Sequence, residues 1–300
     1  MTSTEPLIAG VELGGTKCIA VTARGREIVS RAQWPTGDDA AATLSTLAAW
    51  LRAAHRTAPF AALGIASFGP LCLDATAPDY GRIINTPKPG WSGADVLGVL
   101  AGDLGVPVAI DTDVAGAALA EGRWGASVGC PVHVYLTIGT GIGGGIVVVG
   151  KPLHGSFHPE MGHVRVRRAA GDAFMGVCRV HGDCLEGLAA GPAIAARTGR
   201  PAEELGSDDP VWALVAGEVG DLMASLILML APHRIVIGGG VGQGQLALLP
   251  LVHEATARLL GGYLPGQSLE ALQDLIVHPG IGGDAGVCGA LALALTALAD

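Results

Sequence analysis

Positive charge is scarce in this 300-residue chain. Lysine and arginine together number 18, against 27 aspartates and glutamates, so the net charge is −9 and the pI lies near 5.4. Nucleic-acid binding requires clustered lysines and arginines that neutralise phosphates, and the chain has no basic run. We therefore expect no nucleic-acid partner, and small-molecule chemistry becomes the default expectation.

Long apolar runs and an N-terminal leader are also missing. The longest apolar stretches, at residues 222–231 and 285–299, fall short of the 18 or more residues of a membrane span. They predict buried helices and no membrane partner. Residues 1–30 lack the basic segment, apolar core and cleavage site of a secretory leader, which predicts a cytoplasmic protein.

Cysteine is sparse, but two of the six cysteines form a pattern. Cys178 and Cys184 stand three residues on either side of His181. Zinc prefers four tetrahedral nitrogen and sulfur ligands, so this knuckle can supply three, with His163 or His158 as the fourth. A Cys178–Cys184 disulfide is the alternative, but it needs an oxidising compartment. We favour zinc, which would also fix two carboxylates that lie close to its ligands in the sequence.

The length and a repeated pattern predict two domains. Three hundred residues, half of them hydrophobic, exceed one ordinary core and suggest two domains of about 150 residues each. Residues 7–13 and 16–22 predict two strands around the turn Gly14-Gly15, and residues 133–138 and 146–149 repeat this unit around the glycines of 139–145. Two αβ halves that each begin with a glycine-turned hairpin suggest a duplicated fold with a central cleft.

Further elements follow from apolar patterns and turn signals. We expect helices at 38–52, 114–122 and 211–230, strands at 62–66, 106–110 and 234–237, a loop at 238–240, and a last helix capped by Asp284.

The glycine turns resemble two nucleotide motifs without matching them. Gly139-x-Gly141-x-x-Gly144 satisfies the dinucleotide fingerprint, but a strand follows it where that fingerprint requires a helix. The first turn has the order Gly15-Thr16-Lys17, which is not that of a P-loop. Glycine turns nevertheless expose backbone N–H groups that can cradle a polyphosphate. The alternative is that glycine only makes tight hairpins, but two turns and a third glycine cluster favour phosphate binding.

The motifs of the chain form one set along its length: Val11 to Lys17, Ile65 to Pro70, Thr86 to Trp91, Asp111-Thr112-Asp113, Thr137 to Gly145, Glu160-Met161-Gly162-His163, Cys178 to Glu186, and Gly238 to Val241. Together these motifs resemble the ROK sugar kinases, and most closely their bacterial fructokinase branch, over residues 7–299. The resemblance implies an actin-like, ribonuclease-H-like α/β fold of two αβ domains, 1–115 joined by 285–300, and 116–284, with ATP and Mg²⁺ in the cleft.

The resemblance also implies roles for single residues. Asp113 matches the catalytic base, which the reaction needs because an attacking sugar hydroxyl must lose its proton. The alternative for Asp113 is the N-cap of the helix that follows it. Phosphate contacts are implied for Gly14, Gly15, Thr16 and Lys17 in the first hairpin and for Thr137, Gly139, Thr140 and Gly141 in the second, and the nucleoside loop matches Gly238, Gly239 and Gly240.

Substrate contacts are implied for Glu160, His163, Glu186 and Thr112. Carboxylates suit vicinal hydroxyls, and His163 can bind zinc through one ring nitrogen and sugar through the other. The implied ligand set is then His163, Cys178, His181 and Cys184.

Two residues depart from the family pattern. Glu12 replaces the usual aspartate on the Mg²⁺ side, as in the resembling fructokinases, and Ala115 replaces an asparagine near the sugar and the catalytic loop. We therefore expect activity to survive with reduced efficiency or sugar affinity.

The function implied is ATP-dependent phosphorylation of a hexose, D-fructose to fructose 6-phosphate, by a homodimer. Kinases for glucose, mannose or N-acetylmannosamine are the alternatives, and a non-catalytic sugar-sensing regulator is another. Regulators of the family carry a helix-turn-helix domain ahead of the first hairpin, whereas this chain is acidic and its hairpin begins by residue 7.

Overall fold

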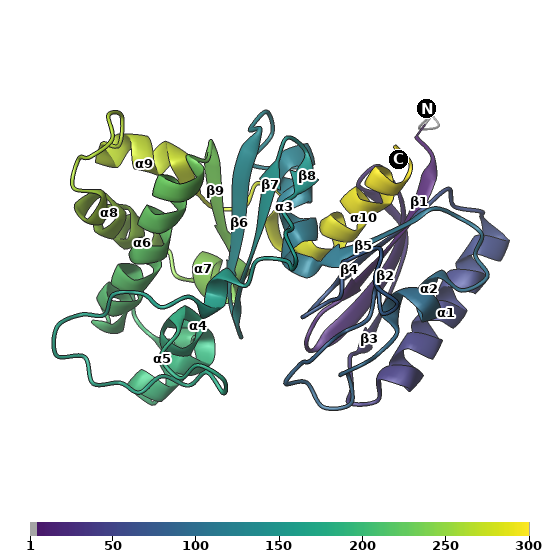
Figure 1. The fold of residues 1–300 in the computed structure, drawn as a ribbon, viewed down its shortest axis with the longest axis horizontal. Coiled ribbons are helices and arrows are strands. Elements are labelled where there is room, and N and C mark those ends of the chain that lie inside the picture. Colours follow the sequence, from purple (N-terminus) through teal and green to yellow (C-terminus); the bar gives the residue numbers. More distant parts are fainter. Residues whose placement is uncertain (1–4, 300) are drawn as a thin grey trace. The chain divides into compact units, whose positions relative to one another are not determined.

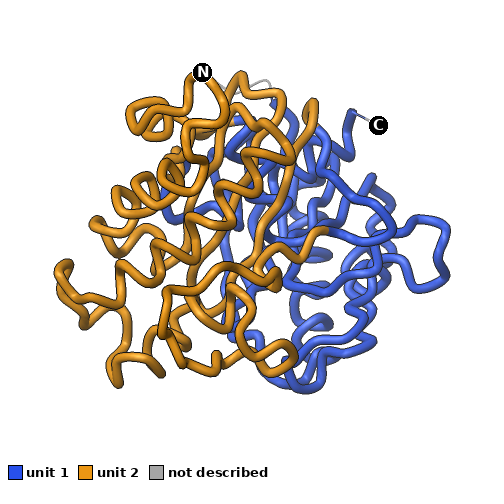
Figure 2. The backbone as a smooth tube through the Cα atoms, turned by 60° about the vertical axis from the view of Figure 1, so that its left-hand side comes forward, with its two compact units in different colours: residues 1–123, 151–158, 281–300 blue, residues 124–150, 159–280 orange. Residues whose placement is uncertain are grey.

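The computed structural model describes residues 5–299, and the chain divides into two compact units (Figure 2). Of the described residues, unit 1 holds those up to 123, 151–158 and those from 281 on. Unit 2 holds residues 124–150 and 159–280. The sequence placed the end of the first domain at residue 115, whereas the whole of helix α3 (Asp113–Trp124) except its last residue lies in unit 1.

Unit 1 is built on a five-stranded sheet (Figure 1). The central strand β1 is almost fully buried and apolar on both faces, as expected for a strand covered on both sides. It pairs antiparallel with β2 and parallel with β4, and β4 pairs parallel with β5. The order is β3 (Glu27–Pro35), β2 (Lys17–Arg24), β1 (Leu7–Leu13), β4 (Leu63–Ser67) and β5 (Val108–Thr112).

Strand β3 was not predicted. Most of its residues are exposed and its apolar residues alternate poorly, because it forms one edge of the sheet. The sequence therefore carried too weak a signal for this strand.

Helices cover both faces of the first sheet (Figure 1). On one face lie α1 (Ala40–Thr57) and α2 (Val96–Ala101). Helix α1 begins two residues after the predicted start at residue 38, with the Asp39 carboxylate accepting the Ala42 amide, and continues beyond the predicted end at residue 52. On the other face lies α10 (Ala285–Ala297), whose backbone approaches Gly64 of β4 so closely that any side chain there would collide with the Ala290 carbonyl.

The predicted cap of α10 is wrong in one respect. Asp284 occupies the N-cap position, but its side chain makes no capping hydrogen bond. Its carboxylate instead pairs with the guanidinium of Arg31 at 3.2 Å. A partner on a neighbouring strand replaces the helix amides here.

The strands of unit 2 lie in the order β10 (Ile276–Val277), β9 (Arg234–Gly238), β6 (Val132–Ile138) and β7 (Ile142–Val148). The predicted turn between β6 and β7 was too long. Glycines 143–145 lie inside β7, paired with β6, so only residues 139–141 turn. The side chain of Met161 packs on Gly144, where any Cβ would collide with it, so Gly144 serves close packing and not the turn.

The predicted loop at 238–240 is also wrong. Gly238 ends β9, and Gly239 and Gly240 begin the short helix α7 (Gly239–Gly244). Gly239 has a φ of +87° and lies so close to the backbone of Ile138 that a side chain at this position would collide with it. The glycines therefore make a sharp strand-to-helix transition. The other helices of unit 2 are α4 (Leu185–Ala189), α5 (Gly191–Thr198), α6 (Val211–Leu230), α8 (Leu248–Leu260) and α9 (Leu269–Leu275), with 3₁₀ turns η1 (Met161–His163) and η2 (Ala202–Glu204).

Helix α6 forms the centre of unit 2 and has the predicted bounds. Among residues 5–299 it is the one helix long and apolar enough to cross a bilayer, although 56% of its most apolar window is buried inside the protein. It packs against α8 and the core of the second sheet. We interpret α6 as a core helix.

Candidate active site

The first glycine turn joins β1 to β2 in unit 1. The Gly14 amide donates to the Lys17 carbonyl at 3.0 Å, and the Gly14 carbonyl accepts from the Thr36 hydroxyl at 2.6 Å. A Cβ on Gly15 would meet nothing within 4 Å, and Gly15, Thr16 and Lys17 are exposed. These two hydrogen bonds fix the base of the turn, and its tip remains open to a ligand, as a phosphate-binding hairpin requires.

The predicted base lies where β5 meets α3. The Thr112 hydroxyl accepts the Ala115 amide at 3.1 Å, which is the hydrogen bond of an N-cap. Asp113 lies in the first turn, and its Oδ1 accepts the Val114 amide at 2.9 Å. Thr112 therefore fills the capping role that was the alternative for Asp113.

A pair formed by buried Asp111 and partly buried His154 supports this loop within unit 1. Asp111 Oδ2 lies 2.8 Å from His154 Nε2, and Asp111 Oδ1 accepts the Thr112 amide at 2.7 Å. The hydrogen bond to Asp111 raises the pKa of His154, and burial works against that rise. The pair ties the strand end that precedes Asp113 to residues 151–158.

His158 also has a structural role in unit 1. Its Nε2 accepts the Leu71 amide at 3.1 Å, and the residue is buried. This ring holds the chain beside Gly69. His158 is not among the clustered side chains of the described residues that could hold a metal ion.

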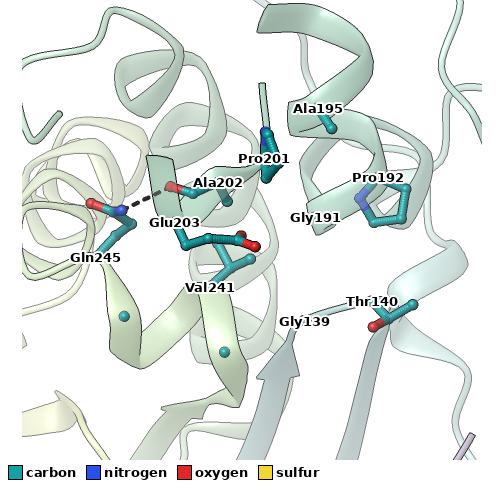
Figure 3. Close-up of a pocket in the computed structure, with 12 residues that line it drawn as sticks. Gly139, Thr140, Gly191, Pro192, Ala195, Pro201, Ala202, Glu203, Val241 and Gln245 are labelled. Atoms are coloured by element: carbon teal, nitrogen blue, oxygen red, sulfur yellow. Dashed lines mark hydrogen bonds between the residues drawn. The ribbon is translucent and has the colours of Figure 1, made fainter. Parts of the chain in front are cut away.

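The second glycine turn borders a cavity of about 680 Å³ in unit 2 (Figure 3). Gly139 accepts the Gly191 amide at 2.8 Å, so the turn is fastened to the start of α5. A Cβ on Gly139 would lie 3.7 Å from the Gly240 amide at the start of α7. Of the residues predicted to bind nucleotide, Gly139, Thr140 and Gly240 line this cavity.

The remaining lining residues were not predicted. One wall is formed by Pro192 and Ala195 of α5, and the other by side chains of η2 and α7 (Figure 3). The Gln245 amide group donates to the Ala202 carbonyl at 3.0 Å, which joins these two segments. Gly191-Pro192 is a helix-start signal, but nothing in the sequence marks this helix as a cavity wall. The lining residues that sequence analysis missed are Gly191, Pro192, Ala195, Pro201, Ala202, Glu203, Val241, Gly244 and Gln245.

Two predicted sugar-binding carboxylates lie near each other in unit 2. Glu186 lies in the first turn of α4, and its Oε2 accepts the Ile142 amide at 3.0 Å beside the second glycine turn. The Glu160 carbonyl accepts the His163 amide at 3.0 Å. Desolvation raises the pKa of Glu160, and the negative charge of Glu186 raises it further. The structure therefore gathers Glu160, His163 and Glu186 within one unit, while Thr112 and Asp113 belong to the other.

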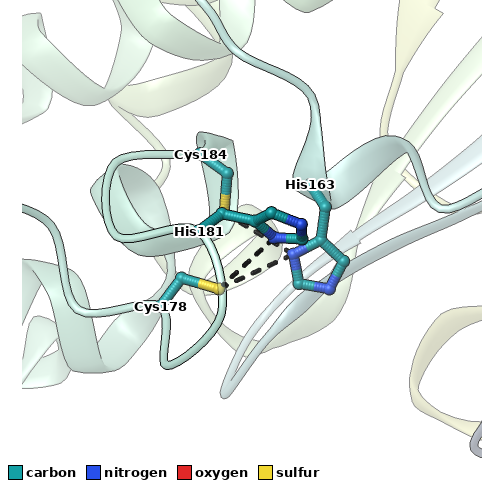
Figure 4. Close-up of side chains that lie close together, drawn as sticks. All are labelled: His163, Cys178, His181 and Cys184. Carbon is teal, nitrogen blue, oxygen red and sulfur yellow. Dashed lines mark hydrogen bonds between the residues drawn. The ribbon is translucent and has the colours of Figure 1, made fainter.

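Four side chains with nitrogen and sulfur donors point toward one another (Figure 4). The Nδ1 of His163 lies 3.8 Å from Cys178 Sγ and 3.5 Å from Cys184 Sγ, and His181 Nδ1 lies 3.8 Å from Cys178 Sγ. Zinc bonds of about 2.3 Å to sulfur and about 2.0 Å to nitrogen, at tetrahedral angles, separate such donors by about 3.6 Å. The donor set therefore fits zinc in both chemistry and spacing, and both cysteines are free thiols.

The knuckle that carries three of these donors is a tight turn. Cys178 and Gly182 exchange two backbone hydrogen bonds of 3.1 and 2.9 Å, and Gly182 has a φ of +67°. A Cβ on Gly187 would collide with the Gly182 carbonyl, so the knuckle packs directly on α4. Burial raises the pKa of the Cys184 thiol, and Cys178 raises it further. Zinc binds cysteine sulfur as the thiolate, so a metal held here would require both cysteines to lose their protons.

Known proteins are similar to this chain along almost their full length. A fructokinase of Zymomonas mobilis is 42% identical over 292 residues, which cover 96% of both chains. A ROK hexokinase of Thermus thermophilus superposes with a TM-score of 0.80 at 29% identity, covering 98% of this chain and 99% of that one. A ROK glucokinase of Streptomyces griseus, solved with glucose and AMPPNP, has a TM-score of 0.75 at 26% identity, covering 97% and 99%.

Two αβ units that each open on a glycine-turned hairpin define the actin-like ATPase fold, as the sequence predicted. Within that class the chain belongs to the ROK family, whose model matches residues 8–297.

Proposed function

We propose that this protein is an ATP-dependent fructokinase that converts D-fructose to fructose 6-phosphate. The observation that carries the proposal is the 42% identity with a fructokinase over 96% of both chains. The solved ROK hexokinase and glucokinase support the broader class, ATP-dependent phosphorylation of a hexose. Glucose, mannose and N-acetylmannosamine are the competing substrates.

Asp113 acts as the general base in this proposal. Its carboxylate takes the proton of the sugar hydroxyl while that oxygen bonds to the γ-phosphorus and the bond to the β-phosphate oxygen breaks. The start of α3 suits the role because Thr112 already satisfies the helix amide that a capping aspartate would otherwise bind.

Sugar recognition falls to Glu160, His163 and Glu186. Each carboxylate accepts hydrogen bonds from hydroxyl groups, and an analogue without the hydroxyl leaves the carboxylate unpaired. The hydrogen bond from Ile142 holds Glu186 in one place. His163 directs Nδ1 to the two thiols, which leaves Nε2 for a sugar hydroxyl.

For ATP, the cavity beside α5 and α7 suits the nucleoside, because apolar side chains form its walls and Glu203 supplies a carboxylate for the ribose hydroxyls. The two glycine turns supply backbone amides for the phosphates. Glu12, whose pKa burial raises and Lys17 lowers, supplies a carboxylate for Mg²⁺ next to the first turn.

Zinc has a structural role in this proposal. His163, Cys178, His181 and Cys184 would hold it, and a closed set of four protein ligands leaves no position for substrate. Its chemical contribution is to fix the knuckle beside Glu186. The reduced thiols of this site accord with the cytoplasmic location we propose.

An assay of ADP release with fructose, glucose, mannose and N-acetylmannosamine, each with ATP and Mg²⁺, tests the proposal. We expect kcat/KM to be highest for fructose. A higher value for another hexose would reassign the substrate, and no ADP release with any of the sugars would contradict the kinase. Light scattering of the same preparation tests the homodimer.

A further inference from the structure

One buried arginine joins three segments of unit 2. Arg197, on α5, has a side chain that is only 6% exposed. Its Nε donates to the Leu188 carbonyl at 3.1 Å, its Nη1 to Asp172 Oδ2 at 3.1 Å and its Nη2 to Glu218 Oε1 at 2.6 Å. Its guanidinium carbon also lies 4.5 Å from the centre of the Phe174 ring. The planar guanidinium has five N–H donors and can bind partners in several directions at once, whereas a lysine ammonium is a point charge.

The partners of Arg197 lead to the sugar side of the site. Leu188 belongs to α4, which carries Glu186 in its first turn. Asp172 and Phe174 lie in the segment that enters the metal-binding knuckle, and Asp172 accepts the Phe174 amide at 3.0 Å. Arg168 continues the network, since it binds Asp172 at 3.1 Å and Asp183, the neighbour of Cys184, at 3.5 Å. The network thus reaches both ends of the knuckle.

The third partner makes this network costly to keep. Glu218 of α6 has a side chain that is only 2% exposed, and its Oε2 has no hydrogen-bond partner among the described residues. Desolvation raises the pKa of Glu218 to about 7, against the pull of Arg197. Buried ion pairs of this kind add little net stability compared with apolar packing, but they can specify one arrangement of the groups they join.

We propose that Arg197 is a positioning residue for the sugar site, which holds α4 and the knuckle against α6 so that Glu186 and His163 keep their places. This inference rests on the proposed sugar kinase function. The nucleoside cavity should not depend on it in the same way. Ala195 lines that cavity, and a separation of two residues on a helix turns Arg197 about 200° away from it.

The test compares Arg197→Lys with Arg200→Lys in the full-length protein. The lysine at 197 keeps the charge that Glu218 and Asp172 need but cannot bind three segments at once. Arg200 is the matched control, because its side chain is 54% exposed and its guanidinium pairs with Asp209 at 3.2 Å near the same end of α5. Steady-state kinetics give separate KM values for fructose and ATP, and hydrogen exchange by mass spectrometry reports the backbone amides of residues 168–189.

We expect Arg197→Lys to raise the KM for fructose by about fivefold or more, with the KM for ATP within about twofold. Amide exchange in residues 168–189 should quicken in this variant and not in Arg200→Lys. Equal rises in both KM values, unchanged exchange, or loss of the folded state in Arg197→Lys would each contradict a positioning role. The exchange measurement needs no turnover, so if the wild-type protein phosphorylates no sugar, the kinase proposal fails while the exchange result still decides whether Arg197 holds the segment.

Discussion

The two units hold their chemical groups by different means. In unit 1, Asp113 follows directly from β5, whose partners and register place it at the start of α3. In unit 2, the segment from residue 159 to 184 carries Glu160, His163 and the knuckle. The short 3₁₀ turn η1 is the only helix or strand in this segment, all of which the structure describes. Sheet hydrogen bonds position the first group, whereas ion pairs, a thiol and imidazole cluster and glycine contacts position the second. The position of Asp113 therefore depends on the backbone of unit 1, whereas the positions of Glu160 and His163 depend on contacts between side chains.

The variant Asp113→Asn gives the sharpest test of the site residue in unit 1. The amide keeps the shape of the side chain but cannot take a proton, so we expect kcat to fall by about 100-fold or more while both substrates still bind. Steady-state and binding measurements check this. Asp103→Asn, an exposed carboxylate in the same unit, is the control. An Asp113→Asn enzyme within about threefold of wild type would remove Asp113 as the base.

In unit 2, the proposed zinc site formed by His163, Cys178, His181 and Cys184 is expected to hold the sugar-binding residues in place. We expect one equivalent of zinc to copurify, and Cys178→Ser or Cys184→Ser to release it. The KM for fructose should then rise by about 10- to 100-fold and the KM for ATP far less, because the knuckle packs on α4. Metal analysis and kinetics measure both effects, with Cys130→Ser as the control outside the cluster. A protein without zinc, or a Cys178–Cys184 disulfide found by thiol titration, would contradict this role.

A pH series tests whether unit 1 also relies on a side-chain pair. The pKa of His154 is raised above 6.5 in the folded protein by Asp111, so its contribution is complete below pH 6.5 and is lost as the pH rises through the folded-state pKa. His154→Gln should therefore cost about 1 to 3 kcal/mol of unfolding free energy at pH 6 and less at pH 8.5. Chemical denaturation at both pH values measures this, with His55→Gln as the control, because the His55 ring accepts the Phe60 backbone amide at 3.2 Å. A larger loss of unfolding free energy at pH 8.5 than at pH 6 would show that a charged His154 is not what stabilises the pair.

The smallest expected effect concerns Ala115. Its side chain is buried, beside the hydroxyl of Thr112 that caps α3. Ala115→Asn restores the amide of the family pattern, and we expect kcat/KM for fructose to rise by about 0.5 to 1.5 kcal/mol in free-energy terms, the value of one hydrogen bond. Ala115→Leu has the same branching and the same number of side-chain heavy atoms without the amide, and it should show no gain. An equal or lower kcat/KM for Asn would mean that the loop is overpacked or already held by other contacts.

Local patterns sufficed for much of this protein. The family and the actin-like fold followed from motifs that are each contiguous in the chain, and the two hairpins and α6 followed from apolar periodicity and glycine turns. The spacing of Cys178, His181 and Cys184 is short enough that a single turn brings the three together, so the knuckle was visible without a structure. The errors were local as well, since the glycines of β7 and α7 looked like loops until their packing partners were known.

Local sequence was enough for the two hairpins, for α6, for the family and for three of the four side chains in the cluster that could hold a metal, because these depend on residues close together in the chain. Only the tertiary structure decided that His163 joins the cluster while His158 binds the Leu71 amide, that α5 walls a cavity, and that Arg197 links α4, α6 and the knuckle segment. Each of these contacts joins segments far apart in sequence or chooses between two nearby residues. The path of the intervening loop makes that choice, and loop paths depend on packing and buried hydrogen bonds that no local pattern records.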